Sequence, residues 1–290
     1  MSPVGKPWVS VVVPTRDRPL PLETCLTALD AQTIAERLEV VVVDDGSADG
    51  DTVAAVVARH PRARLLRQDG QGPAAARNAG GRAARAEVLC FTDDDCLPEA
   101  KWAERLFDAI AGGVDAVAGK TLTPPGPLAE ASELISEAPA AAERFAPSNN
   151  LACTKAAFEA VPFDESYVEA AAEDREWCTR LLASDRTLGM EPSARLLHRP
   201  KLTLGSFVRR QVRYGRGAYR YRRSVRRPLE PTGFYVALMQ RGFRRGLTVG
   251  ALVVLSQFAT ALGWAGGWLD RRQEEALSDS RAAERPESGA

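Results

Sequence analysis

Short aliphatic runs alternate with helical segments along the first half of the chain, and the clearest runs end in proline or aspartate. Residues 8–13 and 38–43 have the composition of strands, and residues 22–32 between them have the pattern of a helix. A strand, a helix and a second strand open a parallel α/β sheet. We therefore expect an α/β fold with a Rossmann-like, mostly parallel sheet flanked by helices. Further helices are expected over residues 51–59, 73–84 and 99–111, and further strands over 63–67, 88–92 and 114–119.

Acidic residues directly follow two of the expected strands. Asp44 and Asp45 end the run VVVDD, and Asp93, Asp94 and Asp95 end the run FTDDD. In open parallel sheets the ligand crevice lies beyond the carboxyl ends of the strands, so both groups are expected to border a ligand. The glycine after Asp45 permits a tight turn in which either carboxylate accepts hydrogen bonds from a base or a ribose. A polar turn without a ligand is the alternative for this first group.

The triple aspartate predicts a metal site. Three adjacent carboxylates repel one another unless a cation or strong hydrogen-bond donors offset their charge. Carboxylate ligands of this kind suit Mg²⁺ or Mn²⁺. Asp95 is the expected direct ligand, with Asp93 two residues before it, and an acidic surface loop is the alternative.

Two further segments carry charged groups at the beginning of helices. The run GPAAARNAG places Arg77 one turn inside a helix of small residues, where its forked guanidinium could bind phosphate oxygens. An alanine-rich packing helix with an exposed arginine is the alternative. The run AEDREWCTRLL begins a helix with Glu173 and Asp174 in its first turn, where they either act as a base or complement the helix dipole.

Charge is unevenly distributed, although 38 basic and 38 acidic residues cancel overall. The residues after His198 include 18 basic and 7 acidic ones, so this part carries a net charge of +11 and the part before it −11. Residues 207–227 are dense in arginine and tyrosine. Such a segment suits anionic lipid headgroups or an anionic acceptor better than nucleic acid, and we expect no nucleic acid partner.

An uncharged stretch of 23 residues, 247–269, follows and is long enough to cross a bilayer. Trp264 and Trp268 near its end fit an interfacial aromatic belt, and the preceding arginines fit a cytoplasmic flank. A spanning helix, an amphipathic or re-entrant membrane helix, and a buried or oligomer-forming helix are the alternatives. The five cysteines have no CxxC spacing and no signal peptide is recognised, so we expect reduced, mostly buried thiols in a cytoplasmic, membrane-associated protein.

Taken in order, these motifs resemble glycosyltransferase family 2. The resemblance rests on VSVVVPTRDR, VVVDDGSADG, GPAAARNAG, FTDDDCLP, SNNLACTKAAFEAVPFDE and AEDREWCTRLL, and it extends over residues 9–182. Members of this family have the GT-A fold, in which a nucleotide-binding α/β half is joined to an acceptor-binding half. The resemblance implies a metal-dependent, inverting enzyme that moves a sugar from a nucleotide-diphosphate donor to an acceptor hydroxyl.

The resemblance also implies which residues bind the donor. Asp44 would contact the nucleobase, Asp45 and Asp93 the nucleoside, and Arg77 the diphosphate. The family often has Tyr-Asn where this chain has Arg16-Asp17, so the nucleobase of the donor is left open. Further contacts with the nucleotide sugar are implied for Pro14, Thr15, Asp17, Asn78 and Asp94.

For catalysis, the resemblance implies that Asp174 is the general base and that Glu173 assists it or holds a group of the acceptor. Asp95 would bind Mg²⁺ or Mn²⁺, with Asp93 beside it. His198 would complete the metal coordination, as a histidine does in some relatives, and a merely structural histidine is the alternative.

We expect one catalytic domain with a helical extension. Residues 1–120 would bind the nucleotide sugar, and residues 121–205 would carry the acceptor side and the base. Residues 206–270 would form a basic and hydrophobic, membrane-associated extension, and residues 271–290 a disordered tail. The acceptor would be a glycan, a lipid or a small molecule; a lipid-linked acceptor fits the extension, and the arginines of residues 213–223 could hold its phosphate unless they form a solvated helix.

Two other functions compete with this interpretation. A sugar-phosphate nucleotidyltransferase also combines a Rossmann-like sheet with a metal, but it needs a glycine-rich loop with a basic residue after the first strand. This chain has Pro-Thr-Arg-Asp-Arg-Pro there. A non-catalytic sugar-nucleotide-binding or membrane-scaffold protein would be favoured if the metal or base carboxylates were missing, and Asp93, Asp95 and Asp174 are present.

Overall fold

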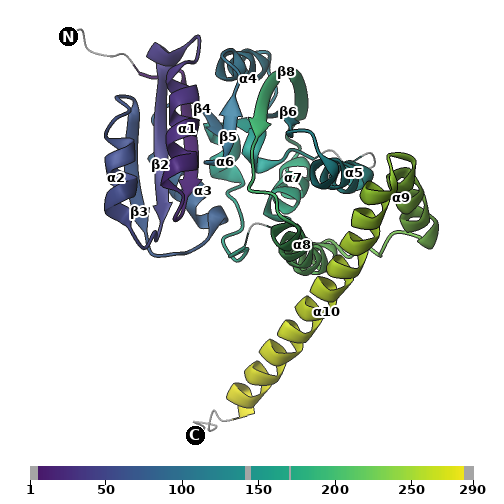
Figure 1. Cartoon of the computed structure of the whole chain (residues 1–290). Coiled ribbons are helices and arrows are strands. Elements are labelled where there is room, and N and C mark those ends of the chain that lie inside the picture. Colours follow the sequence, from purple (N-terminus) through teal and green to yellow (C-terminus); the bar gives the residue numbers. More distant parts are fainter. Residues whose placement is uncertain (1–5, 141–144, 170, 284–290) are drawn as a thin grey trace, which may run out of the picture.

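A mixed sheet lies at the centre of the computed structural model, which describes residues 6–140, 145–169 and 171–283. Within these residues the strand order is β3-β2-β1-β4-β7-β6-β8-β5. Helices cover both faces of the sheet, as Figure 1 shows. The strands are β1 (Val9–Thr15), β2 (Leu38–Asp45), β3 (Ala63–Gln68), β4 (Val88–Phe91), β5 (Cys96–Pro98), β6 (Ala116–Leu122), β7 (Leu151–Thr154) and β8 (Leu188–His198).

The first half of the sheet is parallel, as the sequence predicts. β1 lies between β2 and β4 and is parallel to both, and β2 is parallel to β3. The helices α1 (Pro19–Asp30), α2 (Gly50–Val57) and α3 (Pro73–Ala83) connect these strands. The valines of β1 and β2 are buried because both faces of a parallel sheet are covered by helices. Local patterning therefore sufficed to predict this half.

Two apolar cores lie on opposite faces of the sheet. Val11 and Val12 are neighbours on β1 but belong to different cores, because successive side chains of a strand point to opposite faces. One core contains Trp102 and is covered by α1, α2 and α4; the other contains Trp177 and is covered by α3, α6 and α7. The elements introduced here are α4 (Trp102–Ala111), α6 (Lys155–Ala160) and α7 (Glu173–Ala183), with short 3₁₀ turns at Ala35–Arg37 and Ser148–Asn150.

The second half of the sheet changes direction at β7. β7 is antiparallel to β4 and β6, β6 is parallel to β8, and β5 is antiparallel to β8. The β5–β8 register places His198 opposite Cys96. Since the triple aspartate directly precedes β5, this pairing brings the end of β8 beside it.

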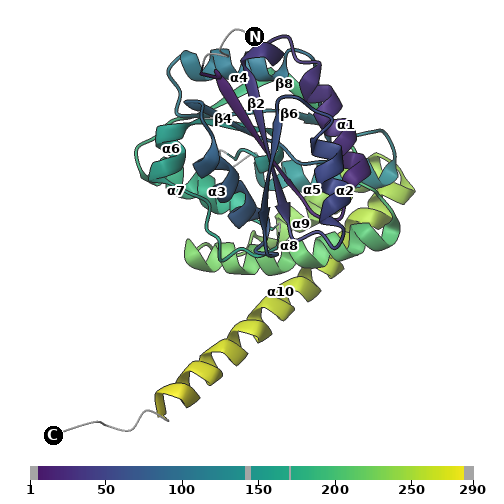
Figure 2. The same cartoon turned by 90° about the vertical axis from the view of Figure 1, so that its left-hand side faces the viewer.

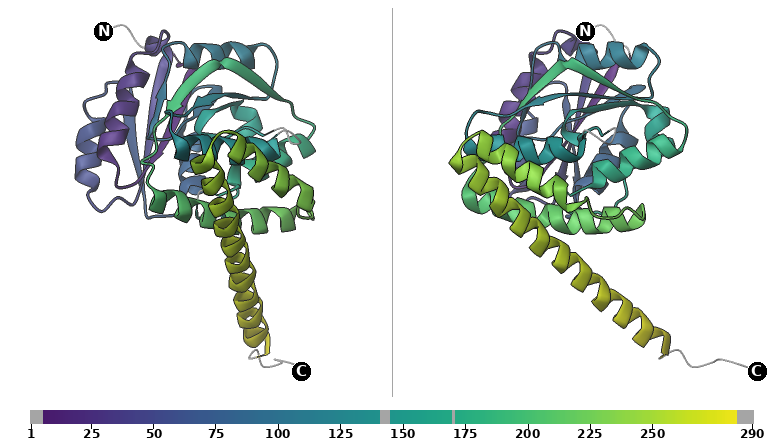
Figure 3. Two further views of the ribbon diagram at one scale, coloured as in Figure 1. Left: turned by 45° about the vertical axis from the view of Figure 1, so that its right-hand side comes forward. Right: turned by 90° about the vertical axis from the view of Figure 1, so that its right-hand side faces the viewer.

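Three helices form a C-terminal extension on one side of the α/β body, as Figures 1 and 3 show. Together with α5 they enclose a small apolar core that includes Leu134, Phe207 and Val253. The later part of α10 continues away from the body as a single helix (Figure 2). The four helices are α5 (Pro127–Ala140), α8 (Leu204–Ser224), α9 (Thr232–Arg244) and α10 (Leu247–Ala283).

Helix α10 is longer than the sequence analysis predicts. A disordered tail was expected from residue 271 onward, but α10 continues to Ala283. The added residues are rich in arginine, glutamate, glutamine, leucine and alanine, which have high helix propensity and extend a helix already formed by the preceding turns. The prediction of disorder is wrong for residues 271–283, and the remainder of the expected tail, 284–290, lies outside the described residues.

Helices α8 and α10 cross at close range because glycines face the partner backbone. A Cβ atom at Gly215 would lie 2.1 Å from the carbonyl oxygen of Thr260. A Cβ atom at Gly263 would lie 1.9 Å from the carbonyl oxygen of Val212. The two backbones are therefore in direct contact, and this crossing fixes α10 on the body.

We expect Gly263→Ala to lower the free energy of unfolding by about 1–3 kcal/mol, because the added methyl group must push the two helices apart. Gly233→Ala is the matched control, since a Cβ atom at this position in α9 would meet no heavy atom within 4 Å. Alanine there should stabilise the helix slightly through its higher propensity. Urea-induced unfolding of the full chain measures both variants, and equal stability of the two would contradict the close crossing.

Candidate active site

The triple aspartate lies at the carboxyl edge of the sheet, next to the end of β1. Thr15, the last residue of β1, donates a hydrogen bond from Oγ1 to Oδ2 of Asp94 over 2.8 Å. Arg18, which directly precedes α1, lies 2.9 Å from Oδ1 of Asp94 and 2.6 Å from Oδ2 of Asp95. One guanidinium thus offsets the charge of two adjacent carboxyl groups.

The two carboxyl groups that Arg18 contacts differ in acidity. Burial raises the pKa of Asp94 to about 7, against the opposing charge of Arg18 and the hydrogen bond from Thr15. Burial would also raise the pKa of Asp95, but the hydrogen bonds and charges of His198 and Arg18 hold that pKa well below its ordinary value. Asp95 is therefore ionised at neutral pH, as an anionic metal ligand must be.

Asp95, Cys96 and His198 form a group that could hold a metal ion, because one ligand atom from each lies within 4.8 Å of the others. Nε2 of His198 lies 3.2 Å from Oδ1 of Asp95, the oxygen that does not face Arg18. Burial raises the pKa of Cys96 well above its ordinary value, so this residue stays a neutral thiol. An oxygen donor and a nitrogen donor that face each other fit a divalent ion such as Mn²⁺.

Arg77 joins the aspartate loop to the helix that carries the expected base. Nη2 of Arg77 lies 2.8 Å from Oδ1 of Asp93, and Nη1 lies 3.1 Å from Oε1 of Glu173. Its Nε is buried without a hydrogen-bond partner among the described residues. The alternative of an exposed arginine on a packing helix is therefore excluded, because Arg77 is 2% exposed. The unpartnered N–H leaves this cation able to donate to an additional anionic oxygen.

Asp93 contacts this arginine and lies outside the group that could hold a metal. The described geometry thus divides the triple aspartate between two cations, with Asp93 on Arg77 and the next two residues on Arg18. A direct metal bond from Asp93 stays a prediction.

Glu173 and Asp174 begin α7, as the sequence predicts. Burial, followed by the adjacent Asp174, raises the pKa of Glu173 to about 7, although Arg77 opposes this effect. Burial also raises the pKa of Asp174, against the charges of Arg175 and Arg77. Carboxyl groups with raised pKa values take up protons more readily near neutral pH, which a general base requires.

The turn before these two carboxyl groups is strained. Ala172 has a φ of 69°, a left-handed conformation that residues with a Cβ rarely adopt. Such a conformation persists only where surrounding contacts enforce it, and it is frequent at functional sites. Here it sets the direction in which α7 starts, and with it the place of Glu173 and Asp174.

The loops after β1 and β2, where nucleoside contacts are expected, are held together by hydrogen bonds. The backbone N–H of Asp17 donates to Oγ of Ser47 over 2.8 Å, and Oδ1 of Asp17 accepts from the N–H of Ala48 over 2.7 Å. Asp44 accepts from the N–H of Ser47 at 3.0 Å. The structure thus brings Asp17 and Asp44 to the same edge as Pro14 and the triple aspartate, because β1 is the neighbour of both β2 and β4.

Two other residues expected to bind the donor are committed to contacts within the protein. Asp45 accepts hydrogen bonds from the N–H groups of Gln71 and Gly72 over 2.7 and 2.9 Å, which fixes the entry to α3. The amide of Asn78 donates to two groups of the segment 163–165 and accepts one hydrogen bond from it. Both residues position α3, and a direct contact of either with a nucleotide stays a prediction.

Arg18 is the site residue to which the sequence analysis assigned no role. It lies in the run VVVPTRDR, which contributed only to the family resemblance. Its sequence context could have identified it. Arg18 is a cation in the loop after one expected strand, and another expected strand ends in three carboxylates. Because β1 pairs with β4, Arg18 and Asp94 are in contact although they are far apart in sequence.

Comparisons with known proteins identify the family to which the chain belongs. The sequence profile of the family described as Glycosyl transferase family 2 matches residues 10–155. A pre-mycofactocin glycosyltransferase of Mycobacterium tuberculosis is 30% identical over 233 residues, which cover 72% of this chain and 46% of that protein. The glycosyltransferase AglE of Haloferax volcanii is 38% identical over 118 residues, which cover 39% of each chain. The match therefore spans less than half the length of both relatives.

The fold is also similar to a solved structure. The mannosyltransferase PcManGT from Pyrobaculum calidifontis, solved in complex with GDP-Man and Mn²⁺, superposes with a TM-score of 0.60 and 23% sequence identity. The superposition covers 97% of this chain and 82% of that one. This likeness confirms the expected GT-A fold, including the helical extension within the matched length.

We expect the stability of the protein to fall between pH 5 and pH 8 because of Glu173. Its pKa rises from 4.5, the ordinary value, to about 7 in the folded chain, so the folded state binds more protons between these values and loses this advantage as the pH rises through 7. Glu173→Gln should reduce the difference in unfolding free energy between the two pH values by on the order of 2 kcal/mol. Denaturant titrations at both pH values measure it.

Glu159→Gln is the control for this experiment, because it removes an exposed carboxyl group from α6. It should keep the pH dependence of the unsubstituted protein, part of which comes from Asp94 in the same direction. If Glu173→Gln and Glu159→Gln had the same pH dependence, Glu173 would not be the titrating group.

Proposed function

Because the chain belongs to glycosyltransferase family 2, we propose that it moves a sugar from a nucleotide-diphosphate donor to an acceptor hydroxyl with inversion at the anomeric carbon. The observation that carries this proposal is the position of Arg77. A single buried guanidinium contacts both the aspartate loop and the first turn of α7, and one of its N–H groups has no partner in the described part of the chain. A diphosphate bound there would lie between the metal group and the expected base.

The donor would be held at the carboxyl edge of the parallel strands. Pro14, Thr15, Asp17 and Asp44 border the place expected for the nucleoside, and Arg77 and Arg18 would bind the phosphate oxygens. Asp95 and His198 would hold Mg²⁺ or Mn²⁺, which would offset the negative charge of the departing diphosphate. The Mn²⁺ in the mannosyltransferase of similar fold supports this choice of ion.

Asp174 takes the proton of the acceptor hydroxyl while the oxygen of that hydroxyl forms its bond to the anomeric carbon. The bond from this carbon to the diphosphate oxygen breaks on the opposite side, and its electron pair leaves with the diphosphate, so the configuration inverts. Arg77 stabilises the charge that develops on the leaving group. Glu173 holds Arg77 in place through their ion pair.

We also propose that α10 lies along the cytoplasmic surface of a membrane. Within the described residues, Leu247–Arg272 is a helix long and apolar enough to cross a bilayer, and an 18-residue window of it has a mean hydropathy of 1.6. Phe258 and Leu262 on this helix are 68% and 69% exposed, whereas Gly263 packs on α8. A membrane-spanning α10 would draw the arginines of α8 into hydrocarbon, which is costly, so attachment in the plane of the membrane fits better.

We expect one nucleoside diphosphate among UDP, GDP and dTDP to bind in the presence of Mn²⁺ and to bind much more weakly without it. Asp95→Asn should weaken this binding roughly tenfold or more, because it removes the ionised ligand. Asp174→Asn should retain nucleotide binding but lower kcat by roughly 10²–10⁴, the usual contribution of a general base. Titration calorimetry and a donor-turnover assay measure the two effects.

Asp108→Asn, which changes an exposed aspartate on α4, is the matched control and should alter neither property. If no nucleotide bound under any condition, the proposed transfer would be contradicted and the membrane-scaffold interpretation would be favoured. Loss of nucleotide binding in Asp174→Asn would exclude a role restricted to proton transfer.

We expect the full chain to bind vesicles that contain phosphatidylglycerol. Leu262→Asp should weaken this binding roughly tenfold, because it replaces a leucine on the apolar surface with a charged residue. Leu20→Asp is the control, because Leu20 is 80% exposed on α1, away from the extension. Vesicle co-sedimentation measures both variants. Equal losses in the two would contradict attachment through α10.

A further inference from the structure

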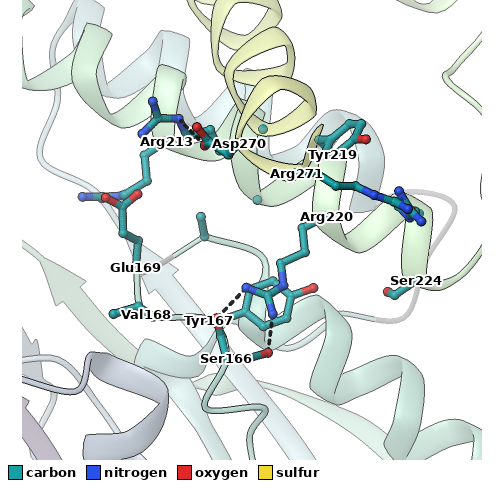
Figure 4. Close-up of a pocket in the computed structure, with 15 residues that line it drawn as sticks. Ser166, Tyr167, Val168, Glu169, Arg213, Tyr219, Arg220, Ser224, Asp270 and Arg271 are labelled. Atoms are coloured by element: carbon teal, nitrogen blue, oxygen red, sulfur yellow. Dashed lines mark hydrogen bonds and ion pairs between the residues drawn. The ribbon is translucent and has the colours of Figure 1, made fainter. Parts of the chain in front are cut away.

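A cavity of about 700 Å³ lies between α8, α10 and residues 166–169 and 171, which precede α7. Figure 4 shows Ser166 and Glu169 on one side of it, and Arg213 and Asp270 on the other. Five arginines and two carboxylates line it, which gives a formal net charge of +3. The arginines are Arg213, Arg216, Arg220, Arg223 and Arg271.

Four of these arginines are spaced by three or four residues along α8, so they share one face of the helix and repel one another. Arg216 pairs with Asp270 at 3.7 Å, and Arg220 donates to Ser166 and lies 4.4 Å from the centre of the Tyr167 ring. These contacts neutralise only part of the charge.

Arg213 and Arg223 contribute two of the excess positive charges. Neither side chain makes a hydrogen bond or an ion pair with the part of the chain that the structure describes. Nε of Arg213 is also buried without a hydrogen-bond partner among residues 6–140, 145–169 and 171–283. A buried donor without a partner and a concentration of like charge are both unfavourable, and an anion would relieve both.

The cavity shares a wall with the candidate active site. A Cβ atom at Gly217 of α8 would lie 2.4 Å from the carbonyl oxygen of Ala171, three residues before Asp174. The hydroxyl groups of Tyr221 and Thr179, 2.9 Å apart, join α8 to α7. A group bound in the cavity would therefore lie beside the first turn of α7, on the acceptor side.

We propose that this cavity binds a phosphate group of the acceptor, and that the acceptor is a phosphorylated lipid; this inference rests on the proposed function. A phosphate ester presents several anionic oxygens, which can accept hydrogen bonds from more than one forked guanidinium. An uncharged sugar would leave the excess positive charge without a counter-charge. The lipid is indicated by α10, because Leu262 and Leu269 are exposed on the same helix that contributes Asp270 and Arg271 to the cavity.

The test uses geranyl phosphate, a short and water-soluble lipid phosphate, with the full chain in a buffer free of divalent ions. We expect the double variant Arg213→Gln/Arg223→Gln to bind it roughly tenfold more weakly or worse, since hydrogen bonds to charged groups are lost. Arg209→Gln, at an exposed arginine of α8 outside the cavity, should bind it as the unsubstituted protein does. Geraniol, which has no phosphate, should bind to none of the three.

Stability separates a binding role from a structural one. The double variant removes like charges that have no partner, so its Tm should equal or exceed that of the unsubstituted protein. Arg213→Lys/Arg223→Lys serves as a second pair if the glutamine variant does not fold, and it should bind with reduced affinity because lysine keeps the charge but loses the fork. Equal affinity for geranyl phosphate in the unsubstituted protein and in the folded variants overturns the proposal.

Two further measurements distinguish an error in the cavity assignment from an error in the proposed transferase function. Mn²⁺-dependent nucleotide binding should be unchanged in the double variant; if it persists while geranyl phosphate binding is insensitive to the variants, the cavity assignment is wrong and the transferase function stands. If nucleotides do not bind at all, the transferase function fails instead. If the double variant loses binding to phosphatidylglycerol vesicles but keeps its affinity for geranyl phosphate, the arginines contact lipid headgroups and the proposal is overturned.

Discussion

The buried guanidinium of Arg77 is the interaction on which the site depends. Removal of a charged group from water costs several kcal/mol unless ionic partners and hydrogen bonds offset it. Arg77 obtains these partners from Asp93, at the edge of the sheet, and from Glu173, at the start of α7. Two segments separated by 80 residues in sequence are therefore held together, since the buried Arg77 and the buried Glu173 are both unfavourable in this position without an ionic partner.

Hydrogen bonds made by other residues near Arg77 also hold α3 in its position. Asp45 fixes the backbone that leads into α3, and Asn78 ties α3 to the segment 163–165. These polar contacts come from residues whose motifs suggest direct binding of a ligand. In this fold, a motif residue can act on the ligand through the placement of a neighbouring side chain, and the sequence alone does not distinguish the two roles.

Local patterns predicted the parallel half of the fold because burial on both faces leaves a continuous valine run in β1 and β2, which few other structures produce. The position of acidic residues at strand ends followed from the same patterns. The partners of those residues did not, because they depend on strand order and register: His198 reaches Asp95 through the β5–β8 pairing, and Arg18 reaches it through β1 and β4. The length of α10 was missed because its charged last turns resemble a solvated tail.

The contact between the loop before α3 and the segment before α7 fixes the spacing between the two sides of the site. Gly72 lies so close to Val168 that a Cβ atom there would be 2.3 Å from its carbonyl oxygen. Gly72 belongs to the loop that Asp45 anchors on the donor side, and Val168 lines the arginine-rich cavity on the acceptor side. Because neither backbone can move toward the other, glycine at position 72 sets the smallest distance between the donor side and the acceptor side, and a larger side chain there would push the two sides apart.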